Sequence, residues 1–336
     1  MQSFIARRLV NAVPVLLLVL LIIFALVRLI PGDPAVTLLG PGASQQQIQA
    51  LRAQLRLDQP LPAQLFGYIG GLAHGDLGRS LRTGRPIAQD VRDFLPATIE
   101  LALSALVLAV VLGIPLALWS ATHAHGASDQ LIRLFSLVGV SAPAFWLALL
   151  LQVIFGVALN WLPVSGRIDV LLHPTRVTGF LLLDALLTGS FGVFINALVH
   201  LILPACVLGA FLVGTVARVL RASIMEQLSE DYARTAVAKG LVSRRVLFGH
   251  VLRNSLLPTV TLVGLKFADL LGGAILTETV FAWPGMGRYM YDAIAARDYP
   301  VIQSVTLLFA VIYVVSSLLV DLLYGVLDPR IRVGEA

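Results

Sequence analysis

The sequence predicts an all-α membrane protein with six transmembrane helices, and three observations lead to this fold class. Of the 336 residues, 58% are hydrophobic and 13% are charged, whereas soluble domains average about half apolar and roughly a quarter charged residues. Six segments are long and apolar enough to span a bilayer. The basic residues gather beside these segments, which is typical of membrane topology signals.

The six predicted spans each hold roughly 20 or more mostly apolar residues. In chain order they are Leu9–Val27, Thr98–Ser120, Leu131–Leu159, Ala197–Val219, Leu256–Val280 and Val305–Leu327. Pro115 interrupts the second span and Pro143 the third, and each proline either makes a packing kink or bends a helix that lines a pathway. The shorter apolar run Val177–Leu187 cannot cross a bilayer, and we expect it at the membrane interface.

The first span follows Arg7 and Arg8 and could be mistaken for a signal peptide. Its apolar stretch is longer than the roughly 7–15 residues of a signal-peptide core. No small-x-small cleavage motif follows it, because the chain continues with Ile30-Pro31-Gly32-Asp33-Pro34. We therefore predict that this segment is retained as the first membrane helix.

The distribution of basic residues predicts how the spans are oriented. The connection between the fourth and fifth spans contains Arg218, Arg221, Arg234, Lys239, Arg244, Arg245 and Arg253. With six spans, this connection lies on the same side as the arginines near both chain ends, and the positive-inside rule makes that side cytoplasmic. The basic segment Pro31–Ala97 is longer than the roughly 60 residues to which the rule applies, and we place it outside the cytoplasm.

These spans divide the chain into three expected parts. Residues 1–95 form the first membrane helix and an extracytoplasmic segment, and residues 96–327 form a transmembrane domain of five helices. A cytoplasmic loop at residues 226–255 interrupts that domain, and residues 328–336 form a cytoplasmic tail. Both termini are then cytoplasmic.

The chain lacks the motifs of an enzyme. No Gly-x-x-x-x-Gly-Lys-Ser/Thr phosphate loop occurs, so we expect no ATP hydrolysis by this chain itself. The single cysteine, Cys206, cannot form a disulfide within the chain, and His123 and His125 lack a carboxylate cluster for a metal site. Topology and anionic lipid explain the net charge of +5 better than nucleic acid does. We predict that the chain binds no cofactor or metal of its own.

The most informative segment lies in the cytoplasmic loop. Ser229 or Asp231 could cap a helix N-terminus, and Gly240 suits the end of that helix. A 3.6-residue spacing places on one face Tyr232, Ala233, Ala236 and Val237. A second, basic helix is predicted to run from Ser243 to the approach of Pro258. The pattern alone fits either a helix that transmits a push from a soluble partner or an ordinary solvated basic loop.

The stretch from Asp231 to Pro258, DYARTAVAKGLVSRRVLFGHVLRNSLLP, resembles the cytoplasmic loop of ABC importer permeases in the dipeptide/oligopeptide family. The general pattern of that loop is Glu-Ala-Ala, three residues, Gly and a later Leu-Pro. Here Arg234-Thr235-Ala236 and Gly240 take these positions, and Leu257-Pro258 follow later than in the general pattern. Both departures are similar to the peptide branch of the family.

Further motifs of that branch occur in order over nearly the whole chain. They are Ile30–Pro34, Leu57–Pro60, Gly75–Ser80, Leu276–Gly285, Asp298–Pro300, Asp321–Gly325 and Asp328–Arg330. Each motif is weak alone, but their order and spacing together are specific. The chain most resembles the B-type permease of a dipeptide importer.

This resemblance implies the transmembrane domain of a type I ABC importer that moves dipeptides or short oligopeptides across the bacterial cytoplasmic (inner) membrane. It implies a homologous second permease as heterodimer partner, two ATPase subunits that use ATP and Mg²⁺, and an extracytoplasmic solute-binding protein. Coupling to an ATPase is then carried by Asp231, Tyr232, Ala233, Arg234, Thr235, Ala236, Val237, Lys239 and Gly240.

Two alternatives stay open at this point. Within the same family the solute could be a nickel chelate or glutathione instead of a peptide. Outside the family, an ion-gradient-driven secondary transporter would explain the hydropathy. Such transporters are expected to show inverted repeats and matched midplane charges, and neither is evident in the sequence.

Four further residues are candidates for a solute pathway or an outer interface. Lys266 and Asp269 lie three residues apart in the fifth span and so share a helical face, where they either line the pathway or neutralise each other. Glu278 lies at the outer end of the same span, and Trp283 lies in the loop that follows. Glu278 could contact the solute, the second permease or the binding protein, and we favour contact with another protein. Trp283 suits either the lipid–water boundary or a rim that docks a soluble partner.

Overall fold

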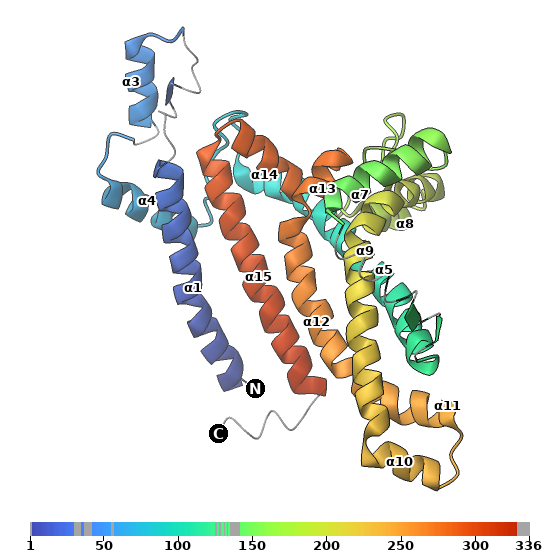
Figure 1. Cartoon of the computed structure of the whole chain (residues 1–336). Helices are drawn as coiled ribbons and strands as arrows, with labels where there is room; N and C mark the ends of the chain where they lie inside the picture. Colours follow the sequence, from blue (N-terminus) through green and yellow to red (C-terminus); the bar gives the residue numbers. More distant parts are fainter. Residues whose placement is uncertain are drawn as a thin grey trace. The chain divides into compact units, whose positions relative to one another are not determined.

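The computed structural model describes residues 2–29, 35–36, 42–54, 57–124, 126–127, 129–130, 132, 134 and 142–327. Within these residues every named element is a helix (Figure 1), and extended backbone pairs at one isolated bridge, between Arg79 and Pro86. The chain divides into two compact units. Unit 1 consists of Met1–Pro96 and Pro284–Val314, and unit 2 consists of Ala97–Trp283 and Val315–Ala336.

Five helical stretches are long and apolar enough to cross a membrane, namely Val10–Leu29, Ile87–Thr122, Phe191–Ser229, Ser243–Gly272 and Tyr299–Val320. The helices that contain them are α1 (Gln2–Leu29), α5 (Ile87–Thr122), α9 (Phe191–Ser229), α12 (Leu252–Gly273) and α15 (Tyr299–Leu327). Each overlaps one of the predicted spans: the first, second, fourth, fifth and sixth. The prediction of an all-helical membrane protein is therefore confirmed.

The third predicted span, Leu131–Leu159, is not described as one long helix. Its described part is mainly α7 (Ala144–Leu151) and the π-helix η1 (Gln152–Ala158), which together are shorter than the spans above. Pro143 occupies the N-cap position of α7, where its missing backbone N–H costs no helical hydrogen bond. Most of the preceding part of this predicted span lies outside the described residues.

The fifth predicted span differs from expectation at both ends. One continuous helical stretch runs through α11 (Ser243–Val246), the π-helix η2 (Leu247–Val251) and α12. Pro258 lies inside α12, so the basic helix does not stop before it; membrane helices tolerate such a proline where neighbours compensate the lost hydrogen bond. After Ala274 a separate short helix follows, α13 (Ile275–Val280).

Unit 1 contains α3 (Gln45–Gln54), α4 (Leu61–Ala73) and α14 (Met286–Ala295), together with the first part of α15. The segment Pro284–Val314 therefore groups with the N-terminal part of the chain, whereas the sequence placed it with the second domain. This grouping depends on contacts between residues that are far apart along the chain.

Long-range polar contacts hold unit 1 together. The carboxylate of Asp298 accepts hydrogen bonds from the Ser80 hydroxyl at 2.6 Å and from the backbone N–H of Leu81 at 3.0 Å. The phenol of Tyr289 donates to Asp90 at 2.8 Å. Burial, and then the bond to Asp90, raises the pKa of Tyr289, so this phenol stays protonated as a donor.

Unit 2 is organised around α9, whose small residues allow close helix packing. A Cβ atom added to Gly209 would lie 2.8 Å from Leu108 of α5. One added to Gly113 of α5 would lie 2.7 Å from Val216 of α9. Small residues at such contacts are typical of packed membrane helices. The two helices therefore approach each other more closely than larger side chains would permit.

The short apolar run at residues 177–187 contains α8 (Leu181–Leu187), which agrees with its being too short to span. Asp184 of α8 is buried and accepts hydrogen bonds from the backbone N–H groups of residues 177–179 and from the Thr178 hydroxyl. Burial acts to raise the pKa of Asp184, but these hydrogen bonds together lower it below its usual value. They stabilise the turn that enters α8.

Candidate functional site

The loop that follows α9 is helical, as the sequence predicts. It contains α10 (Asp231–Ala238), which is followed by a turn and then by α11 (Figure 1). The predicted N-cap is wrong, because Glu230 occupies that position and no side chain caps the helix. The Ser229 hydroxyl instead donates to the carbonyl oxygen of Glu226 at 2.7 Å.

The C-terminal end of α10 depends on Gly240. This residue has a φ of +81°, in the left-handed region that favours glycine. Its N–H donates to the carbonyl oxygen of Val237 at 2.9 Å, and the N–H of Leu241 donates to that of Ala236 at 3.2 Å. These two bonds form a Schellman motif, which ends a helix by satisfying its last carbonyl groups. Among the described residues beyond its chain neighbours, none has an atom within 4 Å of a Cβ added at Gly240, so the backbone conformation rather than space requires glycine.

The inner face of α10 packs into the membrane helices of its own chain. Ala233 is 2% exposed and belongs to an apolar cluster with Ala117, Ala121, Leu220, Ile224, Val246, Leu247 and Val251. These residues come from α5, α9 and the α11–η2 stretch, and Ala236 and Leu241 pack against the same cluster. Because buried side chains are close-packed, a displacement of α10 moves the ends of these helices with it.

The outer face of α10 is exposed. Val237 is 57% exposed, and Tyr232 is 36% exposed, with its hydroxyl donating to the side chain of Gln227 at 2.7 Å. Other exposed residues of this stretch are Asp231, Arg234, Thr235 and Lys239. The predicted face of Tyr232, Ala233, Ala236 and Val237 is therefore split, because the inner face is centred between the two alanines. The apolar residues at its edges remain available to a partner.

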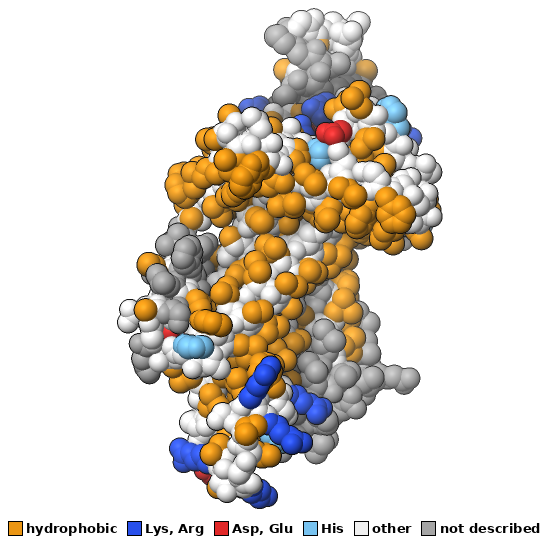
Figure 2. All heavy atoms as spheres, turned by 90° about the vertical axis from the view of Figure 1, so that its right-hand side faces the viewer, with side chains coloured by type: hydrophobic (Ala, Val, Ile, Leu, Met, Phe, Trp, Pro, Cys, Tyr) orange, Lys and Arg blue, Asp and Glu red, His pale blue; other side chains and the backbone are white. Residues whose placement is uncertain are grey.

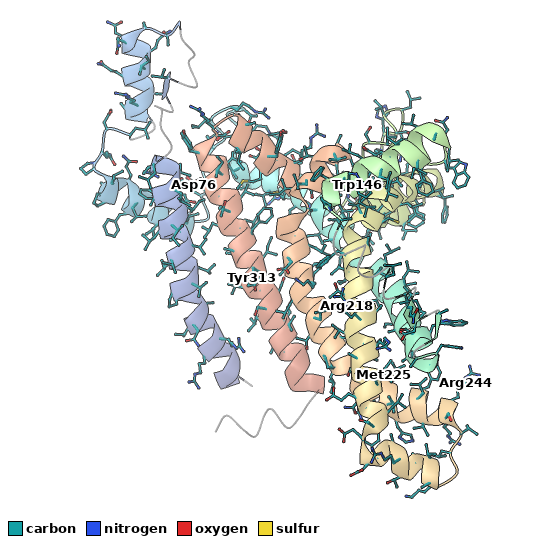
Figure 3. The ribbon with its side chains drawn as sticks, in the orientation of Figure 1. Asp76, Trp146, Arg218, Met225, Arg244 and Tyr313 are labelled. Atoms are coloured by element: carbon teal, nitrogen blue, oxygen red, sulfur yellow. The ribbon has the colours of Figure 1, made fainter. Side chains whose placement is uncertain are left out.

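Basic side chains of α11 lie next to α10. Arg244 and Arg245, with Val242 and Phe248, line an open hollow at this end of the protein. The Arg244 guanidinium lies 6.0 Å from the centre of the Phe248 ring and projects from the start of α11 (Figure 3). Figure 2 shows several Lys and Arg side chains at the same end, below a largely hydrophobic surface. The sequence placed these arginines in a basic helix but did not assign them to the site.

A buried ion pair connects α9, the helix that precedes α10, with the segment that follows α5. Arg221 of α9 binds Asp129 through two hydrogen bonds, Nε to Oδ1 at 2.8 Å and Nη2 to Oδ2 at 2.9 Å. The Asp129 side chain is 0% exposed, and it also accepts a bond from the Ser120 hydroxyl at the end of α5. The sequence counted Arg221 only as a topology signal and gave no sign of Asp129, because their contact joins residues separated by 92 positions.

Lys266 and Asp269 form the ion pair that their spacing on α12 allows. The Lys266 Nζ atom lies 2.6 Å from Asp269 Oδ2. The side chains are nevertheless 31% and 51% exposed. The two side chains therefore neutralise each other's charge while both remain partly exposed.

Glu278 and Trp283 are buried in unit 2, whereas the sequence placed them at a possible pathway or outer interface. Glu278 is 0% exposed and accepts a hydrogen bond from the Thr98 hydroxyl at 2.7 Å. The Trp283 indole N–H donates to the carbonyl oxygen of Ala97 at 3.0 Å. Both side chains therefore fasten the end of α13 and its following turn to α5.

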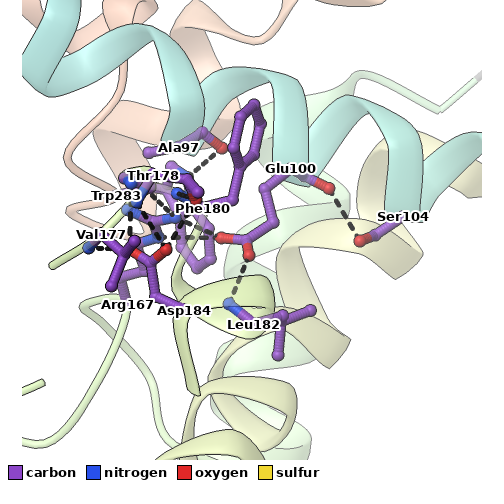
Figure 4. Close-up of polar contacts among 11 residues, drawn as sticks. Ala97, Glu100, Ser104, Arg167, Val177, Thr178, Phe180, Leu182, Asp184 and Trp283 are labelled. Carbon is purple, nitrogen blue, oxygen red and sulfur yellow. Dashed lines mark hydrogen bonds and ion pairs between the residues drawn. The ribbon is translucent and has the colours of Figure 1, made fainter. Parts of the chain in front are cut away.

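Trp283 belongs to a larger polar region around the start of this part of α5 (Figure 4). The Glu100 carboxylate accepts hydrogen bonds from Arg167 Nε at 3.0 Å and from the backbone N–H of Leu182 at 2.8 Å. The Arg167 guanidinium lies 6.0 Å from the Trp283 ring centre. Sequence reasoning missed this region; the one available signal was a carboxylate, Glu100, near the start of a predicted span.

Two families match the sequence. "Binding-protein-dependent transport system inner membrane component" matches residues 113–333. "Binding-prot-dependent transport system membrane comp, N-term" matches residues 1–102. Together these matches include α1, most of α5 and the helices α9, α10 and α11.

Curated relatives align over nearly their full length. The chain is 50% identical over 317 residues to the "Probable D,D-dipeptide transport system permease protein DdpB" of Escherichia coli, covering 94% of this chain and 93% of the relative. It is 45% identical over 333 residues to the "Di/tripeptide transport system permease protein DppB" of Pseudomonas aeruginosa, covering 99% of each chain. It is 44% identical over 336 residues to the "Dipeptide transport system permease protein DppB" of Escherichia coli, again covering 99% of each. The chain therefore belongs to the family of binding-protein-dependent transport system inner membrane components.

Proposed function

We propose that this chain is a permease subunit of an ATP-driven importer that moves dipeptides or short oligopeptides into the bacterial cytoplasm. The observation that carries the proposal is α10, a short helix with an exposed outer face and an inner face built into the membrane helices. The names of the relatives, which are permease proteins of dipeptide and di/tripeptide transport systems, support the peptide as solute. The chain itself is a transport subunit and not an enzyme.

The chain supplies half of the pathway in this proposal. A homologous second permease supplies the other half as a heterodimer partner. Two ATPase subunits bind ATP and Mg²⁺ on the cytoplasmic side, and an extracytoplasmic solute-binding protein delivers the peptide. This chain holds no cofactor of its own.

The proposed topology has six spans, with both termini in the cytoplasm and the segment between α1 and α5 outside. The concentration of Lys and Arg on α10 and α11 supports a cytoplasmic position for that end of unit 2 by the positive-inside rule. The five apolar helical stretches and the partly described third span are compatible with this count.

Coupling proceeds through the two faces of α10. The exposed residues Tyr232 and Val237 seat against an ATPase subunit, with Arg234 and Lys239 making polar contacts. Closure of the ATPase pair on ATP moves the seated helix, and the Ala233 cluster transmits that movement to α5, α9 and α12. ATP can shift the pathway only if the ATPase contacts α10 differently in its two states, as any such coupling requires.

Reconstitution tests the proposed function. The chain is co-expressed with a second permease and two ATPase subunits, and the purified complex is placed in liposomes with the loaded binding protein. We expect labelled dialanine to accumulate only with ATP and the binding protein. Uptake driven equally well by a proton or sodium gradient without ATP would overturn the proposal in favour of secondary transport.

A further inference from the structure

A stripe of α12 is exposed in the part of the chain that the structure describes. At helical spacing it contains Asn254, Pro258, Leu265, Asp269 and Gly272, all of which are exposed. Lys266 stands beside this stripe and pairs with Asp269 at 2.6 Å. The stripe lies in a helical stretch, Ser243–Gly272, that is long and apolar enough to cross the membrane. It therefore combines an intramembrane position with two partly exposed charges.

The neighbouring helix extends this face. α9 packs alongside α12 (Figure 1) and contributes the exposed residues Phe211 and Arg218. The Lys266 Nζ atom lies 5.8 Å from the centre of the Phe211 ring, within range of a cation–π attraction. Arg218, nearer the cytoplasmic end of α9, is labelled in Figure 3. Lys266 thus stands between an aromatic ring on one helix and a carboxylate on its own.

Contact with lipid hydrocarbon is unfavourable for a helix face that contains the charged side chains Lys266 and Asp269. A charged side chain at the centre of a spanning helix is costly to insert, and intramembrane charges almost always face a bundle interior or a water-filled cavity. Pairing reduces this cost but does not explain why both side chains stay exposed. The surroundings of the pair are therefore polar when the protein is assembled.

The pair also has unused hydrogen-bonding capacity. An ammonium group carries three donors and a carboxylate has two acceptor oxygens. Among the described residues, the contact between Lys266 and Asp269 occupies Nζ once and only Oδ2 of the carboxylate. Donors and an acceptor of opposite charge therefore remain side by side on an open face.

We propose that Lys266 and Asp269 form a binding site for the charged termini of a peptide as it passes through the membrane. The α-carboxylate of the peptide accepts hydrogen bonds from Lys266, and its α-ammonium donates to Asp269. The termini of an extended dipeptide lie roughly 6–7 Å apart, so each can reach one member of the pair. This inference rests on the proposed function, because it assigns a place for the solute of that importer.

The arrangement explains how a zwitterion can cross an apolar region. Four charges of alternating sign stabilise one another, so neither terminus enters the membrane without a partner of opposite charge. The net charge of the pair is zero before and after the peptide passes, because the ion pair between Lys266 and Asp269 forms again once the peptide leaves. A site of this kind holds the peptide weakly enough to release it.

Peptides that differ in side-chain charge distinguish this role from a structural ion pair. We measure uptake of Ala-Lys and Ala-Glu by the reconstituted complex with saturating loaded binding protein. Asp269→Asn leaves the Lys266 ammonium without its partner and is expected to shift the ratio of uptake toward Ala-Glu by about tenfold. Lys266→Met leaves the Asp269 carboxylate alone and is expected to shift the ratio toward Ala-Lys by a similar factor. A tenfold shift corresponds to about 1.4 kcal/mol. Leu265→Ala, on the same stripe, is the uncharged control and should leave the ratio unchanged.

Each other outcome decides against the site. Loss of both peptides together with a lower Tm of the complex in both variants would assign the pair a structural role, because loss of a terminus contact alone leaves Tm unchanged. Loss of the second permease on purification would assign the pair to the permease interface. The double variant Lys266→Asp with Asp269→Lys keeps an ion pair and guards against misfolding of the single variants. Failure of the wild-type complex to accumulate any peptide with ATP would instead reject the proposed function.

Discussion

The backbone N–H of Leu241 donates a hydrogen bond of 3.2 Å to the carbonyl oxygen of Ala236, and this bond closes the helix that carries the exposed coupling residues. It forms because Gly240, between them in the chain, takes a left-handed conformation with a φ of +81°. The direction in which the chain leaves α10 and enters α11 depends on this turn. A family motif, a glycine after a short helix, therefore has a definite geometric role here.

Replacing Gly240 should loosen this turn. Gly240→Ala requires an L-residue in the left-handed region, which costs about 1–2 kcal/mol. We expect a lower Tm of the detergent-solubilised complex and less peptide uptake per ATP. Gly249→Ala, in η2, is the matched control, because Gly249 has no positive φ and its added Cβ meets no atom within 4 Å. Equal effects of the two substitutions would argue against a special role for the turn.

Cross-linking should detect the partner of the exposed face of α10. In a background where Cys206→Ser removes the natural cysteine, Val237→Cys is expected to cross-link to an ATPase subunit with a short bismaleimide, more strongly in one nucleotide state. Leu171→Cys is an equally accessible control in the connection between η1 and α8, since Leu171 is 90% exposed. Cross-linking of Leu171→Cys but not Val237→Cys to the ATPase would reverse the proposed orientation.

Breaking the buried ion pair should destabilise the ends of α5 and α9. Asp129→Ala leaves Arg221 without its bidentate partner, and loss of one member of a buried pair typically costs about 3 kcal/mol or more. Thermal unfolding of the purified complex measures this effect. Asp231→Ala removes a fully solvated carboxylate from the exposed pair with Arg234 and should leave Tm nearly unchanged. If Asp129→Ala and Asp231→Ala have the same Tm, the ion pair between Asp129 and Arg221 does not stabilise the protein.

The lowered pKa of Asp184 predicts a dependence on acid. Its usual value is 3.8, and hydrogen bonds from residues 177–179 place the folded-state pKa below that. The stabilisation is therefore fully present above pH 3.8 and is lost as the pH falls through the lower folded value. We expect Asp184→Asn to reduce Tm at neutral pH and to flatten its fall below about pH 4. An unchanged acid profile in this variant would refute the assignment.

Local sequence patterns were sufficient to predict α10 and five of the six predicted membrane helices. Apolar length determines a span within one segment, and Gly240 marks a helix end through the conformation of a single residue. The same reasoning failed at the N-cap, where Ser229 and Asp231 are good capping residues but Glu230 takes the position without a side-chain bond. Capping preference is a tendency of residue types, and it did not decide this position.

Contacts between distant residues were beyond the reach of the sequence. Glu278 and Trp283 were predicted at an outer interface because each is polar or amphipathic at a span end. Their partners, Thr98 and Ala97, precede them by 180 and 186 positions, and no local pattern indicates such a pairing. Asp129 with Arg221 was missed for the same reason. The described part of the third predicted span also shows that apolar composition does not exclude a break at Pro143.

The most direct test of the account is the amount of dipeptide accumulated per ATP hydrolysed by reconstituted complexes that carry Ala233→Leu. The larger side chain overpacks the cluster that joins α10 to the membrane helices, at a cost of about 1–3 kcal/mol. Ala238→Leu, exposed at the end of α10, is the control. We predict that Ala233→Leu retains ATP hydrolysis stimulated by the binding protein while uptake per ATP falls about tenfold, and that the control keeps the wild-type ratio. An unchanged ratio in Ala233→Leu would contradict the claim that α10 drives the pathway through this cluster.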